Sequence, residues 1–178
     1  RYALPLCLLI QAVLLLPRLD LLPVWGDEHF TLQTAAKPLP ALLDTVRQEV
    51  NNPPLHPLLV HFWLRLPLPG SEAARARALS VLFVMMATVL LDRLWLRTLS
   101  ERCRLLYLCL WCLSPYLLLY SRMARSYTIQ AALFCVALWI VARLLAGHWN
   151  YWLWLAFALV ITALLYVHYL PGIAVIGA

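Results

Sequence analysis

The sequence predicts an all-α protein, a polytopic bundle of transmembrane helices. Hydrophobic residues make up 64% of the 178 residues and charged residues only 12%, with a mean hydropathy of +0.80. An average soluble domain is only about half apolar. The apolar residues also occur in runs long enough to cross a bilayer. Too few polar residues remain to cover a soluble core, so the composition excludes a soluble domain and argues against a nucleic-acid partner.

Hydropathy divides the chain into about six spans. We interpret residues 1–178 as one transmembrane domain, in which 1–23 hold the first span, 24–70 an outer loop and 71–178 the remaining spans. The chain opens on Arg1 rather than methionine and stops inside an apolar run. We therefore expect it to be the N-terminal fragment of a longer chain. The individual spans are expected at 2–22, 74–95, 105–120, 127–145 and 149–167, with a sixth from about Leu170.

The outer loop contains two amphipathic stretches rather than a span. Apolar residues recur at helical spacing over 39–50 and again over 55–66, on either side of the breaker NNPP at 51–54. Both stretches are too short to cross a bilayer. We therefore expect two helices that lie in the membrane interface.

Counting spans places four polar segments on one side of the membrane. If Arg1 is cytoplasmic, then WGDEHF (25–30), NNPPLH (51–56), SRMARSY (121–127) and HYLPG (168–172) all lie outside the cytoplasm. The basic turn at 97–104 then obeys the positive-inside tendency. We predict a multi-pass protein of the plasma or inner membrane, or of the endoplasmic reticulum, with its active site on the extracytoplasmic side.

Two adjacent carboxylates, Asp27 and Glu28, directly follow the first span. Removal from water raises the pKa of a carboxyl group above about 4, which suits a general base near neutral pH. The pair also fits a solvated loop or a helix cap, and composition does not decide between these interpretations. Adjacent side chains point in different directions, so both are not expected to act on one substrate.

Arg122 and Arg125 form a second candidate group. They are three residues apart at the head of a span, a spacing that places two side chains on one side of a helix. There they could bind a phosphate together with the helix N-terminus, and Tyr127 adds a hydroxyl group. The alternative is a pair of interfacial anchors.

The histidines form a third group. Their spacing matches no standard zinc motif, so hydrogen bonding is the favoured role. The sequence requires no cofactor and assigns no metal ligand, and a divalent metal stays open as an alternative. On the expected outer side lie His29, His56, His61 and His168.

The order of these motifs resembles the N-terminal part of the GT-C glycosyltransferases. More narrowly, it resembles the branch that contains the protein O-mannosyltransferases and the lipid A aminoarabinose transferases. The segments WGDEHFT, NNPPLHPLLVHFWL, YSRMARSY and YVHYL follow one another over essentially the whole chain. The resemblance implies an inverting transferase. It would move a hexose or pentose from a polyprenyl-phosphate donor to a hydroxyl group of a lipid, glycan or protein outside the cytoplasm.

The resemblance also implies roles for single residues. It makes Asp27 the catalytic base, with Glu28 as the acid that often follows it. Arg122, Arg125 and Tyr127 match a family segment that would contact the donor phosphate. Two positions depart from the family, because Met123 replaces an acidic residue and Asn52 stands where relatives have His or Lys. The candidates for substrate contact are His29, Asn52, His56, His61, His168 and Tyr169.

Two other functions fit the same fold class. The first is a transporter or flippase-like protein whose outer charges form a vestibule, although transporters usually place ionisable groups near the membrane midplane. The second is a catalytically silent scaffold of the GT-C type, which the departures at Met123 and Asn52 would explain.

Overall fold

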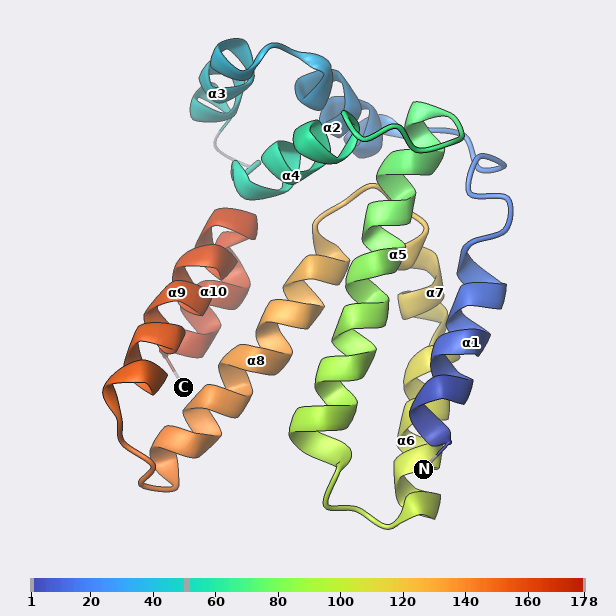
Figure 1. The fold of residues 1–178 in the computed structure, drawn as a ribbon. Helices are drawn as coiled ribbons and strands as arrows, with labels where there is room; N and C mark the ends of the chain where they lie inside the picture. Colours follow the sequence, from blue (N-terminus) through green and yellow to red (C-terminus); the bar gives the residue numbers. More distant parts are fainter. Residues whose placement is uncertain (1, 50–51, 178) are drawn as a thin grey trace.

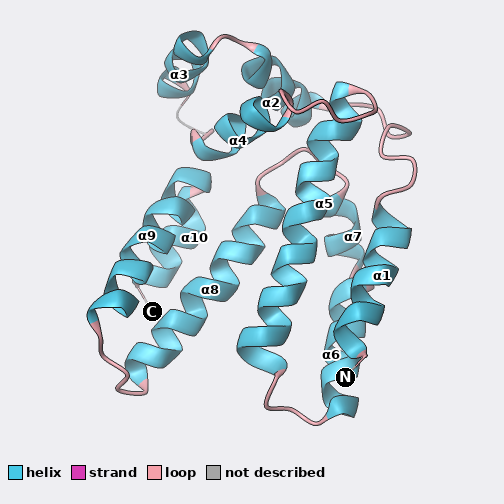
Figure 2. Cartoon of the chain, in the orientation of Figure 1, coloured by secondary structure: helices cyan, strands magenta, loops and turns pink. Residues whose placement is uncertain are grey.

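The computed structural model describes residues 2–49 and 52–177, and the regular structure of this part of the chain is entirely helical (Figure 2). This confirms the all-α prediction. The helices are, in order, α1 (Ala3–Leu15), α2 (Gly26–Ala36), α3 (Leu39–Gln48), α4 (Leu55–Trp63), α5 (Glu72–Leu91), the π-helical turn η1 (Asp92–Leu96), α6 (Glu101–Cys112), α7 (Pro115–Ser121), α8 (Tyr127–Leu145), α9 (Tyr151–Val167) and α10 (Tyr169–Ile176).

The longer helices run side by side as a bundle, and α2, α3 and α4 gather across one end of it (Figure 1). Within the bundle α5 packs against α8, α8 against α9, and α1 against α6. Helix α4 contacts both α5 and α9, so the short helices rest on the ends of the long ones. The bundle therefore has one end built from the outer loop and an opposite end built from short turns.

Polar side chains join three helices inside the bundle. The Thr88 hydroxyl donates to Oε1 of Gln11 at 2.9 Å, and the Trp111 indole donates to the Thr88 hydroxyl at 2.9 Å. Gln11 and Thr88 are fully buried between α1 and α5. Hydrogen bonds of this kind link helices where the surroundings are apolar on all sides.

Two helices of the described chain are long and apolar enough to cross a membrane. These are α5 continued by η1, over 25 residues, and α8, over 19 residues. The pair α6 and α7 makes a third if it is counted as one span with a bend of 53°. This is consistent with a membrane protein, but it does not confirm six spans, because α1 and α9 have only 13 and 17 residues.

The first span is shorter than the sequence predicts. Helix α1 ends at Leu15, whereas the apolar run continues to Leu22. Leu16 still has helical dihedral angles, but Pro17 has no backbone N–H to continue the hydrogen bonds of the helix, and Arg18 then adopts a left-handed turn with φ 57°. Residues beyond this turn belong to the connection that leads to α2.

The two amphipathic stretches at 39–50 and 55–66 are helical, as α3 and α4, whereas α2 was not predicted. One face of α2 is buried through the side chains of Glu28, Thr31 and Thr34 together with Ala35. A buried face made largely of polar groups gives no apolar stripe in the sequence, and such a stripe is the usual sign of a helix.

Candidate functional site

Residues from distant parts of the sequence meet at the end of the bundle that carries α2 and α4. They line a cleft of about 50 Å³, which is room for little more than one or two small polar groups. All four segments that the span count placed on one side contribute to this region, because Asp27 of WGDEHF contacts Arg125 from the edge. The cleft is lined by Thr31, Asn52, Pro53, His56, Pro57, Arg125, Ser126, Tyr127, Val167 and His168.

Arg125 is the cation of this cleft. Its Nη1 donates to the Asn52 side-chain oxygen at 3.4 Å and to the Asp27 carbonyl at 3.3 Å. Its Nε is buried and has no hydrogen-bond partner within the described chain. The guanidinium therefore keeps donor capacity for a further acceptor, and its planar fork suits the oxygens of a phosphate.

Two histidines face the same cleft. His56 in α4 is buried, and this burial, helped by the positive charge of Arg125, lowers its pKa to about 3. It is therefore neutral at physiological pH. His168 lies at the junction of α9 and α10, and its Nδ1 is buried with no partner among the described residues. The cleft thus combines one fixed positive charge with the neutral imidazole of His56 and a second imidazole, that of His168.

Asp27 lies at the rim of the cleft, in the first turn of α2. Its side chain is 59% exposed, and one of its oxygens is 3.5 Å from Nη2 of Arg125. The sequence predicted that this acid would be shielded from water, and this is wrong, since more than half of its side chain is exposed. Its exposure instead leaves the carboxylate open to an incoming molecule.

Glu28 is in the opposite situation, with an exposure of only 2%. Its two oxygens accept from Nε and Nη2 of Arg77 at 2.9 and 2.8 Å, and one also accepts from the Ala124 backbone at 2.7 Å. Burial alone raises the pKa of Glu28, but the hydrogen bonds from Arg77 and Ala124 outweigh it and hold the pKa below its ordinary value. Glu28 is a buried, ionised anchor.

Arg77, next to this region, was not among the candidate residues predicted from the sequence. It lies in α5, is 1% exposed, and its Nη1 donates to the carbonyl groups of Leu19 at 2.7 Å and Leu22 at 2.9 Å. With Glu28 it ties together α5, α2 and the connection after α1. The usable signal was its position inside an apolar helix, where a charge needs a partner.

Arg122 does not join Arg125. Its Nη2 donates to the carbonyl groups of Pro17 and Arg18 at 3.0 and 2.9 Å, so it binds the turn after α1. The expectation that the two arginines share one side of a helix is wrong, because residues 122–126 form the turn between α7 and α8. Two side chains three residues apart lie on the same face only when the segment between them is helical.

Three other candidates lie away from the cleft. The Nε2 of His29 is 2.8 Å from Gln33 on the exposed side of α2. His61 is buried and donates from Nδ1 to the Ala35 carbonyl at 2.7 Å. Tyr169 is 47% exposed and does not line the cleft. Of the histidines predicted to contact substrate, the structure therefore brings His56 and His168 together with Arg125.

Metal ligands do not cluster in this region. Across residues 2–49 and 52–177, no three side chains of His, Cys, Asp or Glu come together in a way that could hold a metal ion. The Met123 carbonyl accepts from the Ser80 hydroxyl at 2.7 Å.

Comparisons with protein-family models, with curated proteins and with solved structures found no significant match to this chain.

Proposed function

We propose that the chain is the membrane part of a GT-C-type glycosyltransferase that uses a polyprenyl-phosphate sugar as its donor. One observation carries this proposal. Arg125 extends between an exposed carboxylate, Asp27, and a small cleft whose lining mixes polar residues such as Asn52, His56 and Ser126 with Pro53, Pro57 and Val167. An acid, a cation with spare donors and a nearby apolar bundle are what transfer from a lipid phosphate requires.

In the proposed reaction an acceptor hydroxyl attacks the anomeric carbon of the sugar. Its proton moves to the Asp27 carboxylate as the new carbon–oxygen bond forms. The bond between the anomeric carbon and the phosphate oxygen breaks, and its electron pair stays on the leaving polyprenyl phosphate. Arg125 stabilises the negative charge that develops there. A single carboxylate without a second nucleophile fits one inverting displacement, by analogy with the glycosidases.

The contact between Asp27 and Arg125 implies that the donor binds before Asp27 is free to act as the base. A donor phosphate would compete with Asp27 for the guanidinium of Arg125, because both are anionic acceptors. Binding of the donor would then release the Asp27 carboxylate toward the acceptor. Glu28 has no part in proton transfer under this proposal, since its oxygens are already occupied. It acts as a positioning residue.

The test uses full-length protein in proteoliposomes with a polyprenyl-phosphate hexose or pentose and a panel of acceptors. We expect Asp27→Asn to lower turnover by about a hundredfold or more while donor binding survives. Arg125→Gln should weaken donor binding about tenfold or more. The exposed pair Asp44 and Arg47 in α3 offers matched controls, and Asp44→Asn and Arg47→Gln should change neither quantity.

Four outcomes would contradict the proposal. Transfer that survives Asp27→Asn would remove the base assignment, and unchanged donor affinity in Arg125→Gln would remove the phosphate contact. Movement of substrate across the vesicle membrane without a glycosidic product would identify a transporter. Donor binding without transfer to any acceptor would identify a silent scaffold.

A further inference from the structure

A second basic site lies at the opposite end of α4 from the cleft. A hollow of about 430 Å³ is bounded by the end of α2, the end of α4 and the first turns of α5. Three cations line it, Lys37, Arg65 and Arg75, against one acid, Glu72. None of these four side chains takes part in an ion pair that the described residues provide. The hollow therefore carries positive charge that the protein does not neutralise.

Two buried polar atoms in this hollow have no partner. The Nδ1 of His61 contacts a carbonyl oxygen, which can only accept, so Nδ1 carries the proton and Nε2 is an acceptor. That Nε2 is buried and unpartnered, and His61 as a whole is only 4% exposed. The Nε of Arg75 is likewise buried without a partner in the described chain. The residues that line the hollow thus include one unused donor, Nε of Arg75, and one unused acceptor, Nε2 of His61.

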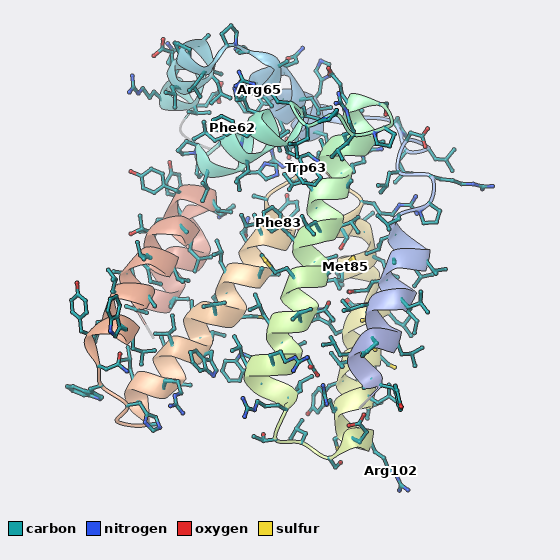
Figure 3. All side chains as sticks on the ribbon, viewed as in Figure 1. Phe62, Trp63, Arg65, Phe83, Met85 and Arg102 are labelled. Atoms are coloured by element: carbon teal, nitrogen blue, oxygen red, sulfur yellow. The ribbon has the colours of Figure 1, made fainter. Side chains whose placement is uncertain are left out.

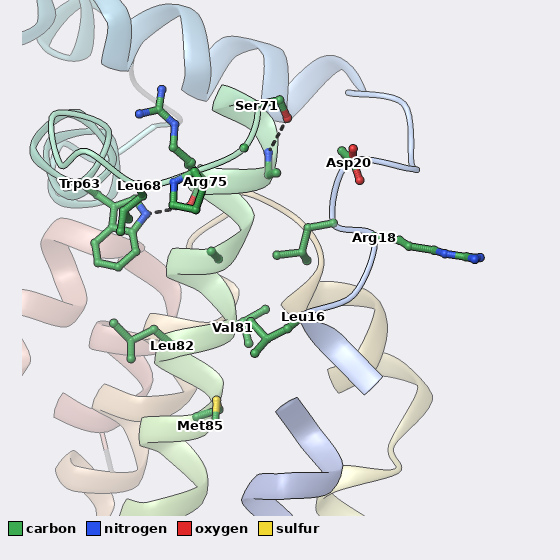
Figure 4. Close-up of a pocket in the computed structure, with 15 residues that line it drawn as sticks. Leu16, Arg18, Asp20, Trp63, Leu68, Ser71, Arg75, Val81, Leu82 and Met85 are labelled. Atoms are coloured by element: carbon green, nitrogen blue, oxygen red, sulfur yellow. Dashed lines mark hydrogen bonds between the residues drawn. The ribbon is translucent and has the colours of Figure 1, made fainter. Parts of the chain in front are cut away.

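Arg75 also lines a larger, mostly apolar hollow of about 550 Å³ between α5 and the connection that follows α1 (Figure 4). The stem of Arg75 lies at the upper end of this hollow, near Trp63, and its guanidinium points away from Leu82 and Met85. The Trp63 indole donates to the Arg75 carbonyl at 2.7 Å, and Nη1 of Arg75 donates to the Leu64 carbonyl at 3.1 Å. The two hollows therefore meet at a fixed arginine.

The position along α5 relates these hollows to a membrane. Helix α5 begins at Glu72 and, continued by η1, is long and apolar enough to cross a membrane, which would put Arg75, in its first turn, at the membrane surface. The apolar hollow extends from there along the same helix, past Val81 and Leu82. Leu82 is 50% exposed on the outer surface of the bundle. A molecule in the apolar hollow would be reached from the lipid.

We propose that the two hollows together bind one anionic phospholipid with a hydroxyl-bearing headgroup, of the phosphatidylglycerol kind. Its phosphate contacts Arg75 and the positive charges of Lys37 and Arg65. A headgroup hydroxyl donates to Nε2 of His61, and one acyl chain lies along Leu82 in the apolar hollow. The uncompensated positive charge selects an anionic headgroup, since a choline headgroup would bring a cation toward three others. This site is independent of the proposed sugar transfer.

Native mass spectrometry of the full chain in a neutral detergent tests the proposal with dioleoyl phosphatidylglycerol and dioleoyl phosphatidylcholine as probes. We expect one phosphatidylglycerol to be retained in preference to phosphatidylcholine. Arg75→Gln should weaken its binding about fivefold, as should the exposed-rim double variant Lys37→Gln/Arg65→Gln. The matched control is Arg102→Gln, at the opposite end of the bundle from Arg65 (Figure 3), which should bind as the unchanged protein does.

A further variant tests the apolar part without changing any charge. Leu82→Trp should fill the hollow and weaken phosphatidylglycerol binding, while a melting curve in the same detergent shows that the fold is kept. Equal binding of the two lipids would overturn the proposal, as would an equal loss in Arg102→Gln or full binding by both charge variants. Glycerophosphoglycerol, which has the headgroup without acyl chains, should compete poorly. Competition equal to that of the intact lipid would identify a soluble phosphodiester site instead.

Discussion

Asp27 and Glu28 are neighbours in the chain but have opposite surroundings. Asp27 is exposed beside Arg125, whereas Glu28 is buried and held by Arg77 and a backbone N–H group. A catalytic base such as the one proposed at Asp27 must be accessible to the substrate. A structural carboxylate such as Glu28 instead has its oxygens engaged in hydrogen bonds within the protein. Geometry therefore divides two acids that the sequence presents as a pair.

Glu28→Gln should destabilise the protein without removing its chemistry. The change leaves Arg77 as a buried charge without its counter-ion, which typically costs about 3–5 kcal/mol. We expect a clear fall in the melting temperature in detergent, and residual transfer below that temperature. Glu49→Gln, at an exposed acid that ends α3, should melt as the unchanged protein does. A variant that melts normally and has lost all transfer would make Glu28 a catalytic residue.

His56 predicts a pH dependence of stability. Its pKa is lowered from 6.5 to about 3 on folding, so between these values the unfolded chain binds a proton that the folded chain does not. The free energy of unfolding therefore decreases as the pH falls through this window, by at most about 1.4 kcal/mol per pH unit. Thermal melting at pH 7 and pH 5 measures the effect.

The control for this prediction is a solvent-exposed histidine of the same protein, His148. His56→Gln should flatten the dependence between pH 7 and pH 5, whereas His148→Gln, at the exposed turn after α8, should leave it unchanged. The lowered pKa of Glu28 also favours unfolding in acid, but only below its ordinary value of 4.5, so it does not contribute in this interval. An equal slope in His56→Gln and the unchanged protein would contradict the assignment.

The sequence identified candidate site residues where a short polar segment interrupts the apolar chain. Asp27, Arg125, His56 and His168 were selected in this way, and the structure brings them to one end of the bundle. Arg77 was not selected, because its partner lies 49 residues away and no local pattern reports such a contact. Its ion pair depends on tertiary packing alone.

Helices were predictable where burial is apolar. The stripes over 39–50 and 55–66 correspond to α3 and α4. The run at 105–120 is divided into α6 and α7, with a bend of 53° between them. Helix α2 was missed because its buried face is polar. The end of α1 was placed too late because hydropathy continues past Pro17, where the helix geometry does not.

The turn between α8 and α9 depends on one glycine. Gly147 has φ +81°, a left-handed conformation that a side chain disfavours by about 1–2 kcal/mol, and an added methyl group would meet nothing within 4 Å. Gly147→Ala should therefore lower stability through the backbone alone, as a small decrease in melting temperature. Gly26 also has open space but no such φ, so Gly26→Ala should be neutral or slightly stabilising. Equal effects at both sites would contradict this account.

At the scale of the whole molecule, the alternation of the chain from one side to the other, which we call the parity of the spans, predicted the arrangement. The predicted number of spans was less successful. The four polar segments meet at one end although α1 and α9 are shorter than predicted spans. Parity requires only that the chain reverses direction at each turn, and short helices reverse it as well as long ones do. The count of six required each apolar run to form one full-length helix. Some runs do not, because α1 ends before Pro17 and the run at 105–120 is divided between α6 and α7.

The proposed side of the membrane can be tested with the chain's own cysteine. Cys103 is exposed near the start of α6, at the opposite end of the bundle from α3. If the end with α2–α4 is extracytoplasmic, a membrane-impermeant maleimide should not label Cys103 in intact cells but should label it after permeabilisation. The double variant Cys103→Ser/Arg47→Cys moves the accessible thiol to an exposed position in α3 and should be labelled in intact cells. Cys103→Ser alone shows the background from the other four cysteines, which are buried or half-buried. Labelling of Cys103 in intact cells, with protection of Arg47→Cys, would place the Arg125 cleft in the cytoplasm and remove the extracytoplasmic transfer proposed for it.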